Sequence, residues 1–225
     1  MPIAHLGLGG SEADAAEVLR SAVRTLDADP GTRVVAVSRL YRSAPIGRAV
    51  GRFVNAAATV EHDGTPATLL RLCQKIERSH GRVASARWDD RPLDIDILLA
   101  DFESDTDELR VPHPLLAVRR FALDPLAEIA ADAVHSRLGV SVGRLAEHWR
   151  KPGLRVRFEA GVPPVEDDRI QQGDEDCHLV LTRVDHAAGW PPAVDLRTIP
   201  LDGVRRQRDA VLAGVLDPPT QFAAF

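Results

Sequence analysis

The segment from Leu93 to Leu99 is apolar except for two aspartates, Asp94 and Asp96. Its length and its aliphatic content predict a β-strand. In a strand, residues two apart share a face, so the two carboxylates should project together, roughly 7 Å apart along the backbone. The aliphatic side chains beside them should point the other way, into a core. We therefore expect an inner strand that is apolar on one face and acidic on the other.

The acidic pair has two interpretations. Burying two carboxylates among aliphatic neighbours is costly without a counter-charge, and magnesium ions, which bind carboxylate and phosphate oxygens, would supply one. Alternatively, the pair lies on an edge strand and faces solvent. The D-x-D pattern alone does not decide between the two.

Basic residues gather just upstream of the acidic pair: Arg78, His80, Arg82, Arg87 and Arg91. The planar fork of arginine makes paired hydrogen bonds to phosphate oxygens. This proximity favours a site for a metal-bound polyphosphate, although a solvated basic loop balanced by Asp89 and Asp90 is the alternative.

A second basic group contains His113, Arg119 and Arg120. His113 lies between two prolines, which restrict its backbone. A functional role beside the two arginines is one interpretation, and a structural histidine is the other.

Strands and helices are predicted in mixed order along the chain. Strands are expected at residues 3–8, 34–40, 53–60, 93–99, 154–158 and 178–184. Helices are expected at residues 15–26, 66–80, 123–129, 141–149 and 204–216. Gly9 and Gly10 predict a tight turn, and residues 42–52 and 82–92 predict loops. Because strands and helices do not alternate strictly, the pattern favours an α+β fold with a largely antiparallel sheet.

The length of 225 residues allows one domain with an appendage, or two small domains. Residues 161–168 (GVPPVEDD) read as a linker, so we expect a main domain at 1–160 and a C-terminal extension at 161–225. The extension is too short to bury much surface alone. We expect it to pack on the main domain or to be partly mobile.

Composition limits the class of protein. Hydrophobic residues make up 44% and charged residues 27%, the balance of a soluble globular protein. The net charge of −5 does not indicate a nucleic acid or an anionic membrane as partner. Two cysteines cannot form a disulfide framework, and Cys73 has the helical spacing of a core residue. No secretory signal or membrane span is evident, so a cytoplasmic location is expected.

Five segments of the chain, in this order, resemble the 6-hydroxymethyl-7,8-dihydropterin pyrophosphokinase family. They are FVNAAATVE, LLRLCQKIERSHGR, RWDDRPLDIDILL, VPHP and RRFALDPLAEIA. The similarity runs from about the N-terminus to Trp149. It implies a ferredoxin-like, three-layer α/β/α sandwich, with ATP and a small pterin as substrates and a monomeric protein.

The resemblance also implies roles for individual residues. Asp94 and Asp96 match the ligands of two magnesium ions, and Arg82 and Arg91 match arginines that act on the triphosphate. Positions matching ATP-binding residues are Glu77, Arg82, Arg87, Arg91, Ile97, His113 and Arg119. Positions matching pterin-binding residues are Ser43, Ala44, Ile46, Phe53, Asn55, Trp88 and Phe121.

The chemistry of the last group agrees with a pterin site. A flat, polar heterocycle needs a slot with aromatic walls and a buried amide. Phe53 and Phe121 match the two stacking rings, and Asn55 offers both a donor and an acceptor to the ring edge. Taken singly, the two phenylalanines would be core residues and Asn55 a satisfied polar group on a strand.

The expected activity is transfer of pyrophosphate from ATP to the hydroxymethyl group of the dihydropterin, in folate biosynthesis. The chain departs from the family pattern at Gly10–Ser11, Ala84 and Asp89–Asp90. Two alternatives therefore stay open: the same transfer to another alcohol, or a binding protein without turnover. A nucleic-acid-binding module is disfavoured by the net acidic charge.

Overall fold

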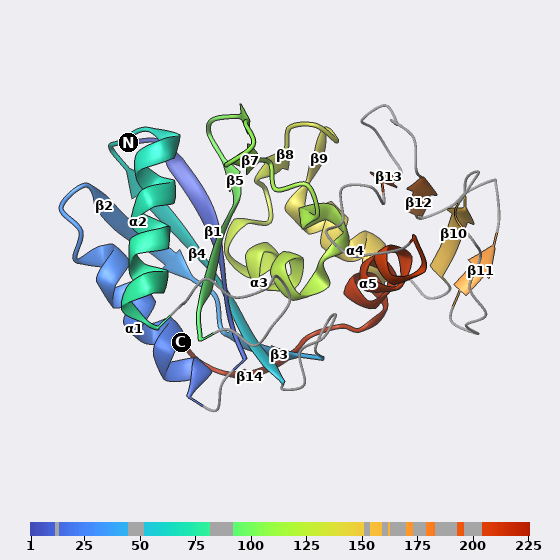
Figure 1. The fold of residues 1–225 in the computed structure, drawn as a ribbon, viewed down its shortest axis with the longest axis horizontal. Coiled ribbons are helices and arrows are strands. Elements are labelled where there is room, and N and C mark those ends of the chain that lie inside the picture. Colours follow the sequence, from blue (N-terminus) through green and yellow to red (C-terminus); the bar gives the residue numbers. More distant parts are fainter. Residues whose placement is uncertain are drawn as a thin grey trace.

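The structure is a computed structural model that describes residues 1–11, 14–44, 52–81, 92–150, 154–158, 162, 170–172, 179–182, 193–195 and 204–225. A six-stranded sheet forms its centre (Figure 1), with strand order β14-β3-β4-β1-β5 and β2 also paired with β4. All of these pairs are antiparallel. The predicted α+β class with a largely antiparallel sheet is therefore confirmed. The strands are β1 (Ile3–Gly10), β2 (Thr32–Val37), β3 (Leu40–Ser43), β4 (Phe53–His62), β5 (Asp94–Ala100) and β14 (Thr220–Ala223).

Helices cover both faces of this sheet. Figure 1 shows α1 (Ala15–Asp27) and α2 (Pro66–Ser79) on one side, and α3 (Arg120–Ala130) on the other. Alternate residues of β4 pack into the cores on the two sides of the sheet, because neighbouring strand residues point to opposite faces. Ala56 and Ala58 belong to the core under α1 and α2, whereas Ala57 belongs to the core that contains α3 and α4 (Val142–Arg150).

Local signals explain the limits of α2. Pro66 occupies the first turn, and the hydroxyl of Thr65 accepts a hydrogen bond from the Thr68 amide at 3.2 Å, which caps the helix. Beyond the C-terminus, Gly81 has a φ of 88°, a conformation that favours glycine. Cys73 is fully buried in the α2 core, and burial raises the pKa of its thiol to about 12. The predicted helix and the core role of Cys73 are both confirmed.

The single strand predicted at residues 34–40 is wrong. The structure has two strands, β2 and β3, that pair in succession with β4 and are separated at Ser38 and Arg39. The Ser38 hydroxyl accepts a hydrogen bond from the Ala57 amide at 2.9 Å, and the Arg39 side chain lies 3.1 Å from the Glu128 carboxylate. The Ser38 amide still donates to Ala57 O at 2.9 Å, so these side-chain contacts add to a backbone bond at the junction of the two strands.

Two further expectations about strands need correction. Gly9 and Gly10 are the last residues of β1 rather than a tight turn, because they continue its pairing with β4. The strand carrying the acidic pair, β5, lies at the edge of the described sheet and is not an inner strand.

The remaining elements follow β5 in the chain. They are β6 (Ser104–Asp105), β7 (Arg110–Val111), the 3-10 helix η1 (Leu116–Val118), β8 (Val134–His135), β9 (Val140–Ser141) and α5 (Val204–Leu216). A separate parallel sheet contains β10 (Leu154–Phe158), β11 (Ile170–Gln172), β12 (Leu179–Thr182) and β13 (Ala193–Asp195). Among the helices that the structure describes, none has both the length and the apolar character needed to cross a membrane.

Candidate active site

Three neighbouring strands bring acidic and amide side chains to one face of the sheet. In the antiparallel register, Gly9 of β1 lies between Asp94 of β5 and Asn55 of β4. Asp96 lies two residues beyond Asp94, opposite Gly7. Residues directly opposite in antiparallel strands project to the same face. The two carboxylates therefore share a face, as predicted, and Asn55 projects to that same face.

Glycines on the central strand keep the space between these side chains open. A Cβ at Gly9 would lie 3.4 Å from Asn55 Oδ1, so any larger side chain would fill the gap between the amide and the acids. A Cβ at Gly7 would lie 3.1 Å from the Leu98 side chain. Sequence reasoning missed this role; glycines two residues apart in a predicted strand were the available signal.

The acidic side of the face is partly accessible and carries one described arginine. Arg119, between η1 and α3, lies 3.9 Å from Asp96, whose side chain is 41% exposed. An accessible pair at this separation contributes little to stability. In the parts of the chain that the structure describes, no group of three or more potential metal ligands occurs. A cation here would therefore take two protein carboxylates and find its other ligands elsewhere.

His113 is held as a neutral hydrogen-bond donor beside the acids. Its backbone amide donates to Leu98 O at 2.8 Å, and its Nδ1 accepts from the Leu115 amide at 3.1 Å. This contact leaves the proton of the neutral ring on Nε2. Burial, and then the Arg119 guanidinium, lower the pKa of His113 from 6.5 to about 3, whereas Asp94 opposes the shift. A neutral N–H donor of this kind suits an anionic oxygen.

Glu77 supports the acidic strand from α2. Its side chain is 4% exposed, and its Oε1 accepts a hydrogen bond from the Ile95 amide at 2.8 Å. Ile95 lies between Asp94 and Asp96, so this bond fixes the backbone that carries both carboxylates. Ile97, by contrast, is buried in the core beneath α1 and α2, so its side chain does not reach the acidic face.

The predicted acceptor side is built on β3 and β4. Asn55 is 5% exposed, and its Nδ2 donates to Ser43 Oγ at 2.9 Å. Phe53 pairs with Ser43 and lies two residues from Asn55 on the same strand. Phe121, in the first turn of α3, has its ring centroid 5.6 Å from the Arg119 guanidinium. Strand pairing thus brings together Ser43, Phe53 and Asn55, with the exposed Ala44 at the end of β3.

Five predicted site residues lie outside the described residues: Ile46, Arg82, Arg87, Trp88 and Arg91. The departures at Ala84 and Asp89–Asp90 lie outside them too.

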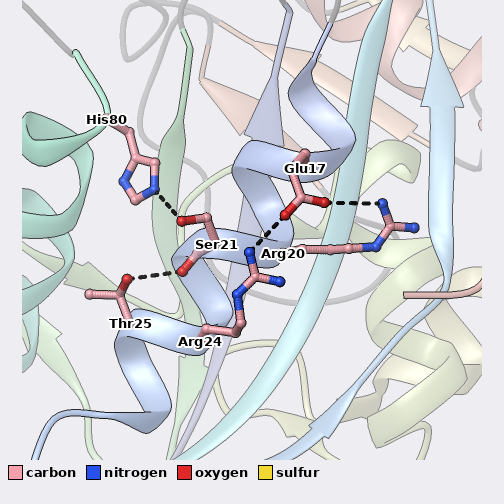
Figure 2. Close-up of polar contacts among 6 residues, drawn as sticks. All are labelled: Glu17, Arg20, Ser21, Arg24, Thr25 and His80. Atoms are coloured by element: carbon pink, nitrogen blue, oxygen red, sulfur yellow. Dashed lines mark hydrogen bonds and ion pairs between the residues drawn. The ribbon is translucent and has the colours of Figure 1, made fainter.

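The histidine grouped with the upstream basic residues has a structural role. Figure 2 shows His80, at the end of α2, directed at Ser21 of α1, with Nε2 3.0 Å from Ser21 Oγ. The Nδ1 of His80 lies 2.9 Å from Ile76 O and donates to it. Nε2 therefore joins the end of α2 to α1, whereas Nδ1 bonds within the last turn of α2, immediately before Gly81.

A family model named 7,8-dihydro-6-hydroxymethylpterin-pyrophosphokinase (HPPK) matches residues 5–131. The chain belongs to this family. The matched region contains every described site residue named above, from Gly7 to Phe121, whereas α5 and β14 lie beyond it.

Curated members of the HPPK family are similar over most of their own length. The 2-amino-4-hydroxy-6-hydroxymethyldihydropteridine pyrophosphokinase of Methylorubrum extorquens is 45% identical over 60% of this chain and 86% of the relative. The enzymes of the same name from Pseudomonas aeruginosa and Bacillus subtilis are 42% and 40% identical, over 80% and 77% of their lengths.

Solved HPPK-DHPS structures share the fold. One, in complex with substrates, aligns with a TM-score of 0.51 at 13% identity, over 66% of this chain. The wild-type protein of Plasmodium falciparum aligns with a TM-score of 0.53 at 13% identity, over 70% of this chain. This chain spans 43% and 47% of those longer chains. Because the identity is only 13%, the likeness concerns the fold alone.

Proposed function

We propose that this protein transfers pyrophosphate from ATP to the hydroxymethyl group of 6-hydroxymethyl-7,8-dihydropterin and releases AMP, a step of folate biosynthesis. One observation carries the proposal: Asp94, Gly9 and Asn55 lie in register across three strands. This register supports a polyphosphate site and a site for a polar ring on one face of the sheet, and the three residues lie within the region that matches the HPPK family.

The acceptor would bind on the β3–β4 side. The bond from Asn55 Nδ2 to Ser43 Oγ fixes the amide, and Asn55 Oδ1 lies over the position where Gly9 lacks a side chain. An acceptor oxygen so placed suits the N–H edge of a pterin. Phe53 and Phe121 would supply the aromatic walls, with Ala44, Ile46 and Trp88 completing the pterin side.

Magnesium fits the residues on the acidic side. Asp94 and Asp96 would hold two ions, whose remaining ligands would be phosphate oxygens and water, since Mg²⁺ is commonly bound through one or two carboxylates plus phosphates. When bound, the ions would neutralise charge on the triphosphate and polarise the phosphorus that is attacked.

The chemical step is a displacement at the β-phosphorus of ATP. The hydroxymethyl oxygen of the acceptor forms the new bond, the bond from the β-phosphorus to its bridge with the α-phosphate breaks, and AMP leaves with the bridging oxygen. The hydroxyl proton passes to solvent. Because such transfers depend on positioning and charge stabilisation, the neutral Nε2–H of His113 and the Arg119 guanidinium would orient the phosphates. Arg82, Arg87 and Arg91 would offset their charge, and Glu77 would hold the strand that carries the acids.

The proposal extends to the form of the protein. Helices on both faces of the sheet support a ferredoxin-like, three-layer α/β/α arrangement. We place the substrate-binding residues within a pyrophosphokinase domain at 1–160, and we treat residues 161–225 as an extension, of which residues 204–225 pack into the main fold. The protein would act as a monomer in the cytoplasm, where ATP is available.

An assay of AMP release tests the activity. With ATP, magnesium and the reduced pterin alcohol, we expect stoichiometric AMP and pterin pyrophosphate. Other hydroxymethyl heterocycles serve as competing acceptors. Faster turnover with one of them would move the assignment to a different alcohol. Tight nucleotide binding without AMP release would identify a binding protein instead.

A further inference from the structure

The C-terminal segment, residues 204–225, is an integral part of the main fold although it lies outside the family match at 5–131. Its helix, α5, contributes Val211, Leu212 and Val215 to the buried core beside α3. Its strand, β14, adds to the main sheet, and the C-terminus lies next to α1 in Figure 1. There, Arg20 Nη2 donates to Ala224 O at 2.9 Å.

The first contact of this segment with the proposed site is through β3. Strand β14 pairs antiparallel with β3, with Thr220 opposite Arg42 and Gln221 opposite Tyr41. The Arg42 guanidinium lies 4.0 Å from the Phe222 ring centroid, within cation–π range. The next residue of β3 is Ser43, which holds the Asn55 amide. Strand β14 therefore borders the strand that orients the predicted acceptor-binding amide.

The second contact is through α5 and the turn before α3. A Cβ at Gly214 would lie only 2.7 Å from Val118 O and 3.9 Å from the Cα of Arg119. The backbones of α5 and η1 thus touch directly, and only glycine permits this approach. The next residue is Arg119, whose guanidinium lies 3.9 Å from Asp96. Helix α5 therefore supports the residue proposed to orient the nucleotide.

We infer that residues 204–225 brace the active site on two sides, with β14 positioning the pterin-binding strand and α5 positioning Arg119. This inference rests on the proposed function, and it makes Phe222 and Gly214 positioning residues. If the segment only stabilised the fold, substitutions within it would lower the unfolding temperature and would affect KM for ATP and KM for the pterin alcohol alike. If the segment supports the site through two distinct contacts, a substitution at each contact should raise KM for one substrate and leave KM for the other nearly unchanged.

Phe222→Ala tests the β14 contact. Loss of the Arg42 stack should loosen β3 and raise KM for the pterin alcohol about fivefold, while KM for ATP changes little. Thr220→Ala, at an exposed position on the same strand, is the matched control and should leave both constants unchanged. Amide hydrogen exchange should accelerate at Tyr41–Ser43 in Phe222→Ala and not in Thr220→Ala.

Gly214→Ala tests the α5 contact. Helix propensity alone would make this substitution stabilising, but the new Cβ would meet Val118 O and force α5 or η1 to move. We expect KM for ATP to rise about fivefold with little change in KM for the pterin alcohol. Amide exchange should accelerate at Leu116–Arg119 and remain unchanged in β3.

Two results would overturn the brace. The first is that, in both folded variants, the two KM values change equally or do not change. The second is that amide exchange accelerates to the same extent in β3 and in η1, whichever contact is altered. Because exchange is measured without substrate, it decides the brace even if the wild-type chain makes no AMP. Absence of AMP with the wild-type chain would instead refute the proposed function.

Discussion

Asp96 is the residue whose proposed role is easiest to isolate. Its side chain is 41% exposed, so Asp96→Ala should change the free energy of unfolding by less than about 0.5 kcal/mol. AMP formation should fall at least about a hundredfold, because a carboxylate ligand of the metal ions is lost. Urea unfolding and an AMP assay measure the two effects. Asp107→Ala, at an exposed position, is the control; turnover retained in Asp96→Ala would refute its role.

Glu77 is predicted to act through the backbone of β5. Glu77→Ala leaves the buried Ile95 amide without this acceptor, which should cost about 1–3 kcal/mol of stability. It should also raise the magnesium concentration needed for half-maximal activity, because the backbone between the two aspartates is released. Glu77→Gln keeps an Oε1 acceptor and should recover most of both losses. Equal effects of Ala and Gln would show that the bond to Ile95 is not the cause.

Alternation along a strand was enough to predict the orientation of Asp94 and Asp96, because it is a local property of the backbone. The sequence could not predict the bond between Glu77 and the Ile95 amide, since it depends on how α2 packs against β5 and involves no second side chain. The register of Asp94, Gly9 and Asn55 was equally inaccessible, because pairing across strands depends on the complete sheet.

Helix α3 is joined to α4 by a buried acid. Asp124 is 6% exposed and lies 3.1 Å from Arg120 and 3.4 Å from Arg150. Asp124→Ala would leave the nearly buried Arg120 without this counter-charge, so we expect a loss of about 3–5 kcal/mol in the free energy of unfolding. Asp132→Ala, at an exposed position just beyond α3, should lose less than about 0.5 kcal/mol. Urea denaturation of the two variants measures both free energies of unfolding. Similar losses in Asp124→Ala and Asp132→Ala would contradict this role of Asp124.

The helix predicted at residues 66–80 agrees with α2, because local chemistry at Pro66 and Gly81 sets its limits. The Thr65 cap was not part of the prediction. The break between β2 and β3 was missed, because it depends on Ser38 and Arg39 meeting partners on β4 and α3. Sequence periodicity reports which face of an element is buried, and it does not report such distant partners.

For the chain as a whole, we expect the free energy of unfolding to fall in mild acid, because several histidines are buried. Burial lowers the pKa of His135 from 6.5 to about 4, and burial also lowers the pKa of His113 and His5. At a pH between 4 and 6.5, His135 binds a proton in the unfolded chain but not in the folded chain. The free energy of unfolding therefore falls as the pH falls from 6.5 toward 4. Chemical denaturation at pH 7 and pH 4.5 should show a smaller loss in His135→Gln than in the wild type. An equal loss in both would contradict the assignment.

The antiparallel α+β class followed from the order of elements, whereas the place of the C-terminal segment did not. Nothing in residues 220–223 indicates a partner strand, because an edge strand pairs mainly through its backbone. Its position against β3 is a property of the folded chain, and so are the contacts of α5 with η1.

A crystal structure of the ternary complex would test the shared face most directly. The chain would be crystallised with Mn²⁺, the pterin alcohol and an ATP analogue that carries a methylene bridge between its α- and β-phosphates. We predict anomalous peaks between the carboxylates of Asp94 and Asp96 and the phosphates, with the pterin ring hydrogen-bonded to Asn55. Manganese bound away from both aspartates, or a pterin bound away from Asn55, would contradict the proposed site.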